Sequence, residues 1–260
     1  MTVEEIIVCM AIKYCGEWND IYAGLTNPQD RDLDEYYKIV QKMKCKYVTI
    51  LSKDYPDYLR NSFKPPFVLF YYGDISLISN IGKNIAVVGS RNCSDYAVEA
   101  TKDIVSEVAK DYNIVSGLAE GIDAIAHEAA IEAGGKTIAV LGTGIDYPFP
   151  PANIPLYKRI KENHLVVSEY PGYSAPRTGT FPMRNRIIAM LSCATLVTEA
   201  YEHSGSLITV MFTLEYGRLL MCIPYPRLAN SECNRLISGG AYLVETGNDV
   251  LKILANDNHF

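Results

Sequence analysis

The chain has 260 residues, of which 24 are Lys or Arg and 30 are Asp or Glu, so its formal net charge is −6. This acidic balance excludes a protein that binds nucleic acid through bulk positive charge, but it is compatible with a local basic pocket. Because 48% of the residues are hydrophobic, the chain can bury a large core, which excludes wholesale disorder. Its length corresponds to one or two domains.

The N-terminal sequence and the cysteines point to one compartment. The first ten residues, MTVEEIIVCM, carry two glutamates where a secretory signal peptide needs positive charge. Apolar runs are short and interrupted by charges, so no membrane span is predicted. The seven cysteines form no C-x-x-C pair, and their odd number is typical of free thiols in a reducing compartment. We therefore expect a cytoplasmic protein that has no membrane partner.

Residues 1–45 have the pattern of a small helical domain. Thr2 and Glu5 have the spacing of a capping box, which predicts a first helix immediately after them. A second helix is expected after Asp32. The polar stretch 17–31 between the two predicts a loop.

Residues 46–260 have the pattern of an α/β domain. Strands are expected at 47–51, 67–73, 84–88, 112–116, 136–141, 164–168, 194–198, 219–223 and 241–244. Helices are expected at 95–110, 121–133, 153–162, 184–192, 206–217, 233–238 and 246–255. Buried strands that alternate with helices predict a parallel, doubly wound sheet. All strand carboxyl ends would then meet at one edge, where such sheets bind ligands.

Small residues follow two adjacent strands of this sheet. Gly89 permits a tight turn, while Ser90 offers a hydroxyl and Arg91 a fixed positive charge, just before a helix start that favours an anion. Ser116 and Gly117 end the next strand. The two turns together would form a groove in which a phosphate or sugar approaches the backbone. Each turn could equally be a plain structural turn between strand and helix.

The turn GTGID at 142–146 does not complete a dinucleotide fingerprint, because the third glycine is missing and it does not follow the first strand. The sequence contains no P-loop and no nucleophile elbow. It also contains no cluster of Cys and His with metal-ligand spacing. We therefore expect no cofactor and no metal.

The segment 170–198 is locally basic. It contains no acidic residue and three arginines, Arg177, Arg184 and Arg186. Phe181 precedes the last two, and Asn185 lies between them. Guanidinium groups pair with phosphates and an aromatic face can stack on a base, so this stretch suits nucleic acid. The structural alternative is a solvated helix start with Phe181 in the core.

The sequence Ser204-Gly205-Ser206 begins a helix directly after the strand at 194–198. The free N–H groups of such a helix start can bind an anion, although ordinary N-capping would use the same residues. Its place beside the basic segment, on the same edge of the sheet, favours the functional interpretation.

Eight motifs follow one another in the order and spacing of the DNA-processing protein A (DprA/Smf) family. They are VVGSR, SGLAEGID-AIAH, IAVLGTGID, SEYP, FPMRNRIIAMLS, EA-SGSLIT, EYGR and NRLISGGA. The resemblance covers about residues 46–252. It implies an extended Rossmann-like, mostly parallel sheet over 46–260, preceded by a small N-terminal helical domain over 1–45.

The resemblance also implies a function. Members of the family bind single-stranded DNA, protect incoming strands in natural transformation, help to load the RecA recombinase, form homodimers and catalyse no reaction. The DNA-binding positions of the family fall on Gly89, Ser90, Arg91, Ser116, Gly117, Phe181, Arg184, Asn185, Arg186, Ser204, Gly205 and Ser206. With phosphates held by Arg91, Arg184 and Arg186, the slope of log K against log salt would be about −2 per protomer.

Some positions depart from the family pattern. Glu120 stands where the family usually has Arg or Lys, which suggests weaker or differently tuned DNA binding. The stretch 224–232 has Pro224-Tyr225-Pro226 in place of Pro-Gly, and Glu232 in place of Gly, so this edge of the domain departs from the family. The chain ends soon after the core, so we expect no C-terminal winged-helix domain.

Two other function classes stay open. A nucleotide-hydrolysing enzyme or sensor of the same superfamily, similar to phosphoribohydrolases, would need a P-G-G-x-G-T signature, which the nearest string at 171–173 lacks. Its candidate acids would be Glu199, Glu202 and Glu215. A protein-interaction module with a decayed DNA pocket is the third hypothesis, and Glu120 and the acidic net charge support it.

Overall fold

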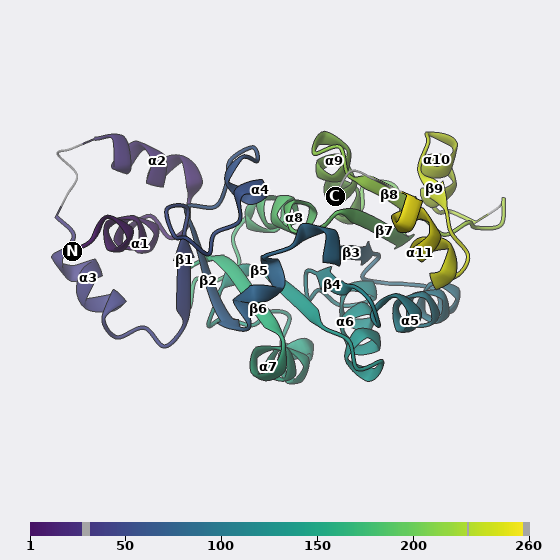
Figure 1. Cartoon of the computed structure of the whole chain (residues 1–260), viewed down its shortest axis with the longest axis horizontal. Helices are drawn as coiled ribbons and strands as arrows, with labels where there is room; N and C mark the ends of the chain where they lie inside the picture. Colours follow the sequence, from purple (N-terminus) through teal and green to yellow (C-terminus); the bar gives the residue numbers. More distant parts are fainter. Residues whose placement is uncertain (28–31, 228, 257–260) are drawn as a thin grey trace.

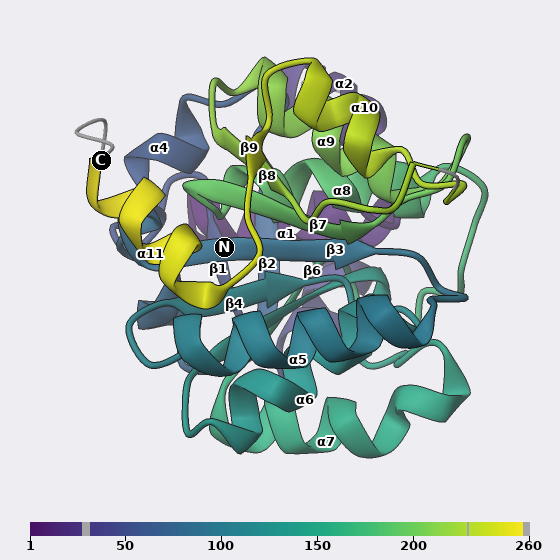
Figure 2. The ribbon, with the colours of Figure 1, turned by 90° about the vertical axis from the view of Figure 1, so that its right-hand side faces the viewer.

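The computed structural model of the chain describes residues 1–27, 32–227 and 229–256. Three parts of the predictions lie outside the described residues. They are the end of the expected loop at 17–31, one position of the 224–232 stretch and the last four residues of the expected α/β domain. Within them, one nine-stranded sheet is enclosed by helices on both faces (Figures 1 and 2). This architecture confirms the predicted α/β class.

The sheet is mostly parallel. Its strands are β1 (Lys46–Thr49), β2 (Val68–Gly73), β3 (Asn84–Gly89), β4 (Asn113–Ser116), β5 (Thr137–Gly144), β6 (Leu165–Tyr170), β7 (Ala194–Glu199), β8 (Leu219–Cys222) and β9 (Tyr242–Leu243). They lie in the order β1-β2-β6-β5-β4-β3-β7-β8-β9. The pairings from β6 to β9 are parallel, whereas β2 is antiparallel to both β1 and β6. Every predicted strand is present, with small shifts at its ends.

Helices cover both faces of the sheet. They are α1 (Val3–Lys13), α2 (Trp18–Thr26), α3 (Asp34–Val40), α4 (Asp57–Arg60), α5 (Asp95–Val108), α6 (Ile122–Glu132), α7 (Ile154–Asn163), α8 (Thr180–Met190), α9 (Ser206–Glu215), α10 (Cys233–Ser238) and α11 (Gly247–Asn256). Short 3₁₀ turns are η1 (Ile75–Ile78), η2 (Ile81–Lys83) and η3 (Pro151–Asn153). Figure 2 shows α5, α6 and α7 on one face and α8 and α9 on the other. Over the described ranges, none of these helices has the length and apolar character that crossing a membrane requires.

The order in which successive strands are added to the sheet reverses at β3. From β3 the chain builds outward through β4, β5 and β6, and it then returns to place β7 on the other side of β3. Helix α5 after β3 and helix α9 after β7 therefore lie on opposite faces of the sheet (Figure 2). Open α/β sheets leave a crevice at such a point, outside the carboxyl ends of the strands.

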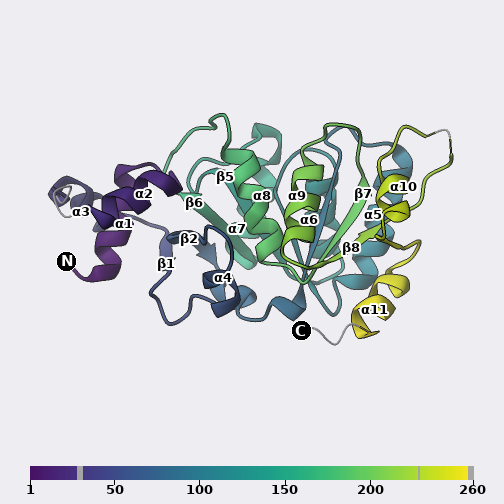
Figure 3. The same cartoon turned by 90° about the horizontal axis from the view of Figure 1, so that it is seen from above.

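The three N-terminal helices pack at one end of the sheet (Figures 1 and 3). The predicted capping box of Thr2 and Glu5 is present at the start of α1. These helices share a hydrophobic cluster with residues of β2 and β6. The division into domains at 1–45 and 46–260 stays a prediction.

The expected loop over 17–31 is wrong for Trp18–Thr26, which forms α2. Tertiary packing explains the helix. The ring of Trp18 stacks on Phe67 at a centroid distance of 5.1 Å, and its indole N–H donates to the carbonyl of Pro65 at 2.8 Å. Ile21, one turn later, is also buried. A polar stretch therefore forms an amphipathic helix, because a distant segment just before β2 supplies its apolar partner.

A buried histidine lies beneath the sheet on α6. The Nδ1 atom of His127 lies 2.6 Å from the hydroxyl oxygen of Thr137, and its Nε2 atom has no hydrogen-bond partner among the described residues. Burial lowers the pKa of His127 to about 3, and the positive charge of Arg184 adds to this effect. The imidazole is therefore neutral in the folded protein at any pH near neutrality.

We expect the free energy of unfolding to fall as the pH drops below about 6.5, where the unfolded chain protonates its histidines. The folded protein keeps His127 neutral, whereas the unfolded chain protonates it. The contribution of this residue to the free energy of unfolding is therefore complete above pH 6.5 and is lost progressively down to about pH 3. One such group contributes about 2 kcal/mol between pH 7 and pH 5. Urea unfolding of the wild type and of His127→Gln at both pH values measures the difference, and equal losses in the two proteins would contradict it.

Candidate functional site

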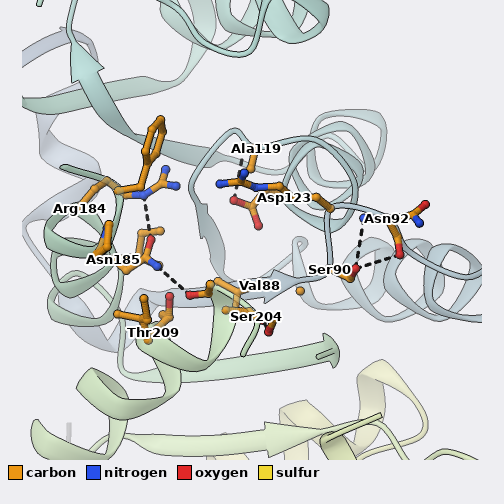
Figure 4. Close-up of a pocket in the computed structure, with 17 residues that line it drawn as sticks. Val88, Ser90, Asn92, Ala119, Asp123, Arg184, Asn185, Ser204 and Thr209 are labelled. Atoms are coloured by element: carbon orange, nitrogen blue, oxygen red, sulfur yellow. Dashed lines mark hydrogen bonds between the residues drawn. The ribbon is translucent and has the colours of Figure 1, made fainter. Parts of the chain in front are cut away.

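A cavity of about 480 Å³ lies where the strand order reverses, at the carboxyl ends of β3 and β7 (Figure 4). Its walls come from the loop after β3, from the start of α6, from α8 and from the start of α9. Nine of the predicted site residues line it, namely Gly89, Ser90, Arg91, Phe181, Arg184, Asn185, Ser204, Gly205 and Ser206. The fold thus brings together turns that are more than 100 residues apart in the sequence.

Phe181 stands in the first turn of α8 between two positive charges. The guanidinium carbons of Arg91 and Arg184 each lie 5.9 Å from the centre of its ring, which is within the range of a cation–π contact. The ring of Phe149 lies 6.0 Å away and is tilted by 49°. Arg91 is exposed and Arg184 is buried, so the half-buried Phe181 lies between a solvated charge and a fixed one.

The guanidinium of Arg184 is anchored by the protein backbone. Its Nη1 group donates to the carbonyl of Val140 at 2.6 Å and to the carbonyl of Gly117, while its Nε donates to the side-chain oxygen of Asn185 at 3.0 Å. Burial lowers the pKa of Arg184 to about 10, although the carboxylate of Asp123 opposes this effect. Arg184 therefore carries its charge at neutral pH. Its Nη2 group makes no hydrogen bond within the described residues.

Two glycines leave the space that Arg184 and Phe181 occupy. A Cβ atom on Gly117 would lie 2.2 Å from Nη1 of Arg184, and a Cβ atom on Gly142 would lie 2.6 Å from the ring of Phe181. With a side chain at either glycine, the guanidinium of Arg184 or the ring of Phe181 would have to leave its present position. Gly142 of the GTGID turn, which is not a dinucleotide fingerprint, thus leaves room for the ring of Phe181.

Asn185 connects α8 to the start of α9. Its side-chain amide donates to the carbonyl of Gly205 at 3.0 Å, as Figure 4 shows. The hydroxyl oxygens of Ser204 and Ser206 lie 2.6 Å apart in the same turn. The N–H groups of Leu207 and Ile208 already donate to the carbonyls of Ser204 and Gly205, at 3.1 and 3.2 Å. The N–H groups of Gly205 and Ser206 donate to no described residue, so they are the ones at this end of α9 that can bind an anion in the cavity.

Ser116 and Gly117 do not offer the donors expected of them. The hydroxyl of Ser116 donates to the carbonyl of Val87 at 2.7 Å. The N–H of Gly117 donates to the carboxylate of Asp123 at 3.1 Å. That buried carboxylate lines the cavity and was missed by the sequence analysis. The sequence feature that could have indicated Asp123 is its place in the first turn of a predicted helix, where the free N–H groups of the helix attract a carboxylate. Burial raises the pKa of Asp123, while Arg184 opposes the rise.

The structure does not bring Arg186 to this cavity, where its predicted role was to hold a phosphate. Arg186 does not line the cavity, and its Nη2 atom lies 2.6 and 2.5 Å from the two carboxylate oxygens of Glu169. The cause is helix geometry, because both arginines lie on α8 and successive residues of an α-helix turn by about 100°. Residues two positions apart, such as Arg184 and Arg186, therefore point to nearly opposite sides.

The third arginine of the basic segment has another partner again. Arg177 donates to the carbonyl of Cys15 at 2.7 Å and pairs with the carboxylate of Glu17 at 3.2 Å, next to α2. The arginines of this segment thus serve three different places, and only Arg184 of these three lines the cavity.

The acids considered for a nucleotide-processing enzyme do not line this cavity. The buried carboxylate of Glu199 accepts from the N–H and the hydroxyl of Ser94, at 3.1 and 2.7 Å, and so stabilises the start of α5. Glu202 and Glu215 are exposed. Within the described ranges, no three His, Cys, Asp or Glu side chains form a group that could hold a metal ion.

Comparison with known proteins gives this cavity a context. Residues 46–255 match the family model of the DNA recombination-mediator protein A. The chain is 42% identical over 221 residues to the DNA processing protein DprA of Streptococcus pneumoniae, covering 84% of this chain and 78% of that protein. It is 35% identical over 238 residues to DprA of Bacillus subtilis, covering 87% of this chain and 80% of that protein.

Two solved structures share the fold. The X-ray structure of DNA processing protein A from Streptococcus pneumoniae has a TM-score of 0.81 and 37% identity, covering 95% of this chain and 92% of that one. The structure from Helicobacter pylori, described for its single-stranded DNA binding mode, has a TM-score of 0.74 and 28% identity, covering 82% of this chain and 98% of that one. These matches confirm the resemblance read from the motifs, and the chain belongs to the DNA recombination-mediator protein A family, whose members include DprA and Smf.

Proposed function

We propose that this chain binds single-stranded DNA in the cavity between β3 and β7 and that it catalyses no reaction on it. The observation that carries the proposal is the grouping of Arg91, Phe181 and Arg184 beside the start of α9. Charged groups for phosphates and an aromatic ring for a base therefore lie in one crevice. The Helicobacter pylori relative, described as binding single-stranded DNA, supports the same ligand.

Each group has a defined task in this proposal. The exposed Arg91 contacts a phosphate, and the Nη2 group of Arg184 contacts a second oxygen from the wall. The N–H groups of Gly205 and Ser206, at the start of α9, complete the anion site. Phe181 stacks on a base, and all four bases can stack in this way. Phosphate contacts and stacking carry no base identity, so these contacts by themselves bind any sequence.

We propose further that the chain acts as a recombination mediator in the cytoplasm. It would protect incoming strands in natural transformation and help to load the RecA recombinase, and it would do so as a homodimer. Membership of the family supports this role. The acidic net charge of −6 fits it, because a focused site with little bulk attraction disfavours non-specific binding to duplex DNA.

The salt dependence of binding tests the charges. Because Arg91 and Arg184 line the cavity and Arg186 does not, we expect a slope of log K against log salt of about −1.4 per protomer, not −2. Arg91→Ala should reduce this slope by about 0.7. The measurement is fluorescence anisotropy of a labelled dT strand at several salt concentrations.

Arg159→Ala is the matched control, because it removes the same charge from an exposed position on α7, away from the cavity. It should leave the slope unchanged. A wild type that fails to bind the strand even at low salt would overturn the proposed function.

A further inference from the structure

A second, smaller cavity of about 130 Å³ adjoins the first. Arg91, Phe181 and Arg184 line both cavities, so the ring of Phe181 and the two guanidinium groups form a shared wall. The ring of Phe149 lines only the smaller one. Since a water molecule takes about 30 Å³ in the liquid, this space corresponds to about four waters. A flat, uncharged ring such as one nucleobase fits its size and its aromatic lining.

Glu120 gives this small cavity a different chemistry from the large one. It lies in the turn between β4 and α6, is exposed and lines the small cavity only. Within the described residues, its carboxylate makes no hydrogen bond or ion pair. A carboxylate repels a phosphate, so its natural partner on a bound strand is an N–H group. On DNA such groups belong to the bases.

The bases differ at this point. Cytosine, adenine and guanine carry an exocyclic amino group that donates hydrogen bonds, and carboxylates accept from such groups. Thymine has a carbonyl oxygen in the place of the cytosine amino group, and its one N–H group, at N3, lies between two carbonyl oxygens that repel a carboxylate. A carboxylate beside a base pocket therefore favours cytosine over thymine. The positive charges of Arg91 and Arg184 do not make this distinction, because they bind phosphates of any sequence.

We propose that the small cavity is a nucleobase pocket in which Glu120 accepts a hydrogen bond from the amino group of a base, while Phe149 and Phe181 contact its ring. The inference rests on the proposed function, because the base belongs to a strand held in the larger cavity. It adds a preference of this chain for amino-bearing bases over thymine.

Two pyrimidine strands of equal length, one of dC and one of dT, test the pocket in anisotropy titrations at pH 8. We expect the wild type to bind the dC strand about threefold to tenfold more tightly than the dT strand. In Glu120→Gln the side-chain amide can accept from an amino group or donate to a carbonyl oxygen, so the two affinities should agree within about twofold. Glu128→Gln, an equal change of charge at an exposed position of α6 that lines neither cavity, should keep the preference.

The outcomes separate this inference from the proposed function. Equal affinity of the wild type for both strands would overturn the base pocket and leave DNA binding intact. If Glu120→Gln strengthened binding to both strands by the same factor, Glu120 would act through repulsion of phosphates alone, which also overturns the pocket. Failure of the wild type to bind either strand at low salt would overturn DNA binding itself.

Discussion

Replacing Arg186 by alanine should lower the free energy of unfolding by about 3–5 kcal/mol. The side chains of Arg186 and Glu169 are only 1% and 3% exposed, and their charged atoms lie 2.5 Å apart. Burial already raises the pKa of Glu169, and Arg186 is the main group that opposes this rise. Without Arg186, a carboxylate would stay buried with no counter-charge. Because domains are stable by only about 5–15 kcal/mol, this loss would be severe.

Urea unfolding followed by circular dichroism measures the effect. Arg177→Ala is the control, because its ion pair with Glu17 is 40% and 48% exposed and such pairs contribute at most about 1 kcal/mol. A double variant, Arg186→Met with Glu169→Leu, should be less destabilised than Arg186→Ala, since it removes both buried charges. A variant Arg186→Ala that is as stable as Arg177→Ala, but binds no DNA, would return Arg186 to the binding site.

The different roles of the arginines show what sequence could not supply. The strands were predictable because apolar, β-branched runs alternate with amphipathic stretches, and their ends meet at one edge in any parallel sheet. That rule gathered Gly89, Ser90 and Arg91 with Ser204 and Gly205 around one cavity. Two residues that are two positions apart on a helix point to nearly opposite sides wherever the helix begins, and the predicted helix 184–192 contains both Arg184 and Arg186. The sequence does not show which of the two faces the cavity, because that depends on how α8 packs against the rest of the fold.

The hydrogen bonds inside the walls were also beyond the sequence. Ser116 ends a strand as predicted, yet a carbonyl of the neighbouring strand takes its hydroxyl. Asp123 looked like part of a helix start, and only the folded loop shows that its carboxylate takes the N–H of Gly117. The sequence predicts where these segments lie, but it does not show which donor and which acceptor face each other. The helix at Trp18–Thr26 was missed for the same reason, because its partner is Phe67.

Phe181→Ala should weaken binding of single-stranded DNA by about 5- to 150-fold, because stacking of a base on an aromatic side chain contributes about 1–3 kcal/mol. The slope of log K against log salt should stay as in the wild type, since the substitution removes no charge. Phe181→Trp should keep most of the affinity, because it offers a larger aromatic face. Anisotropy titration of the labelled dT strand at several salt concentrations measures both quantities.

This pair of readouts separates the ring from the charges around it. Phe181 also contacts Arg91 and Arg184, so its removal could act by releasing their guanidinium groups. In that case the salt slope would fall together with the affinity, as it should in Arg91→Ala. A loss of affinity at constant slope therefore assigns the effect to stacking. Wild-type affinity in Phe181→Ala would contradict a strand that lies against this ring, and with it the cavity between β3 and β7 as the binding site.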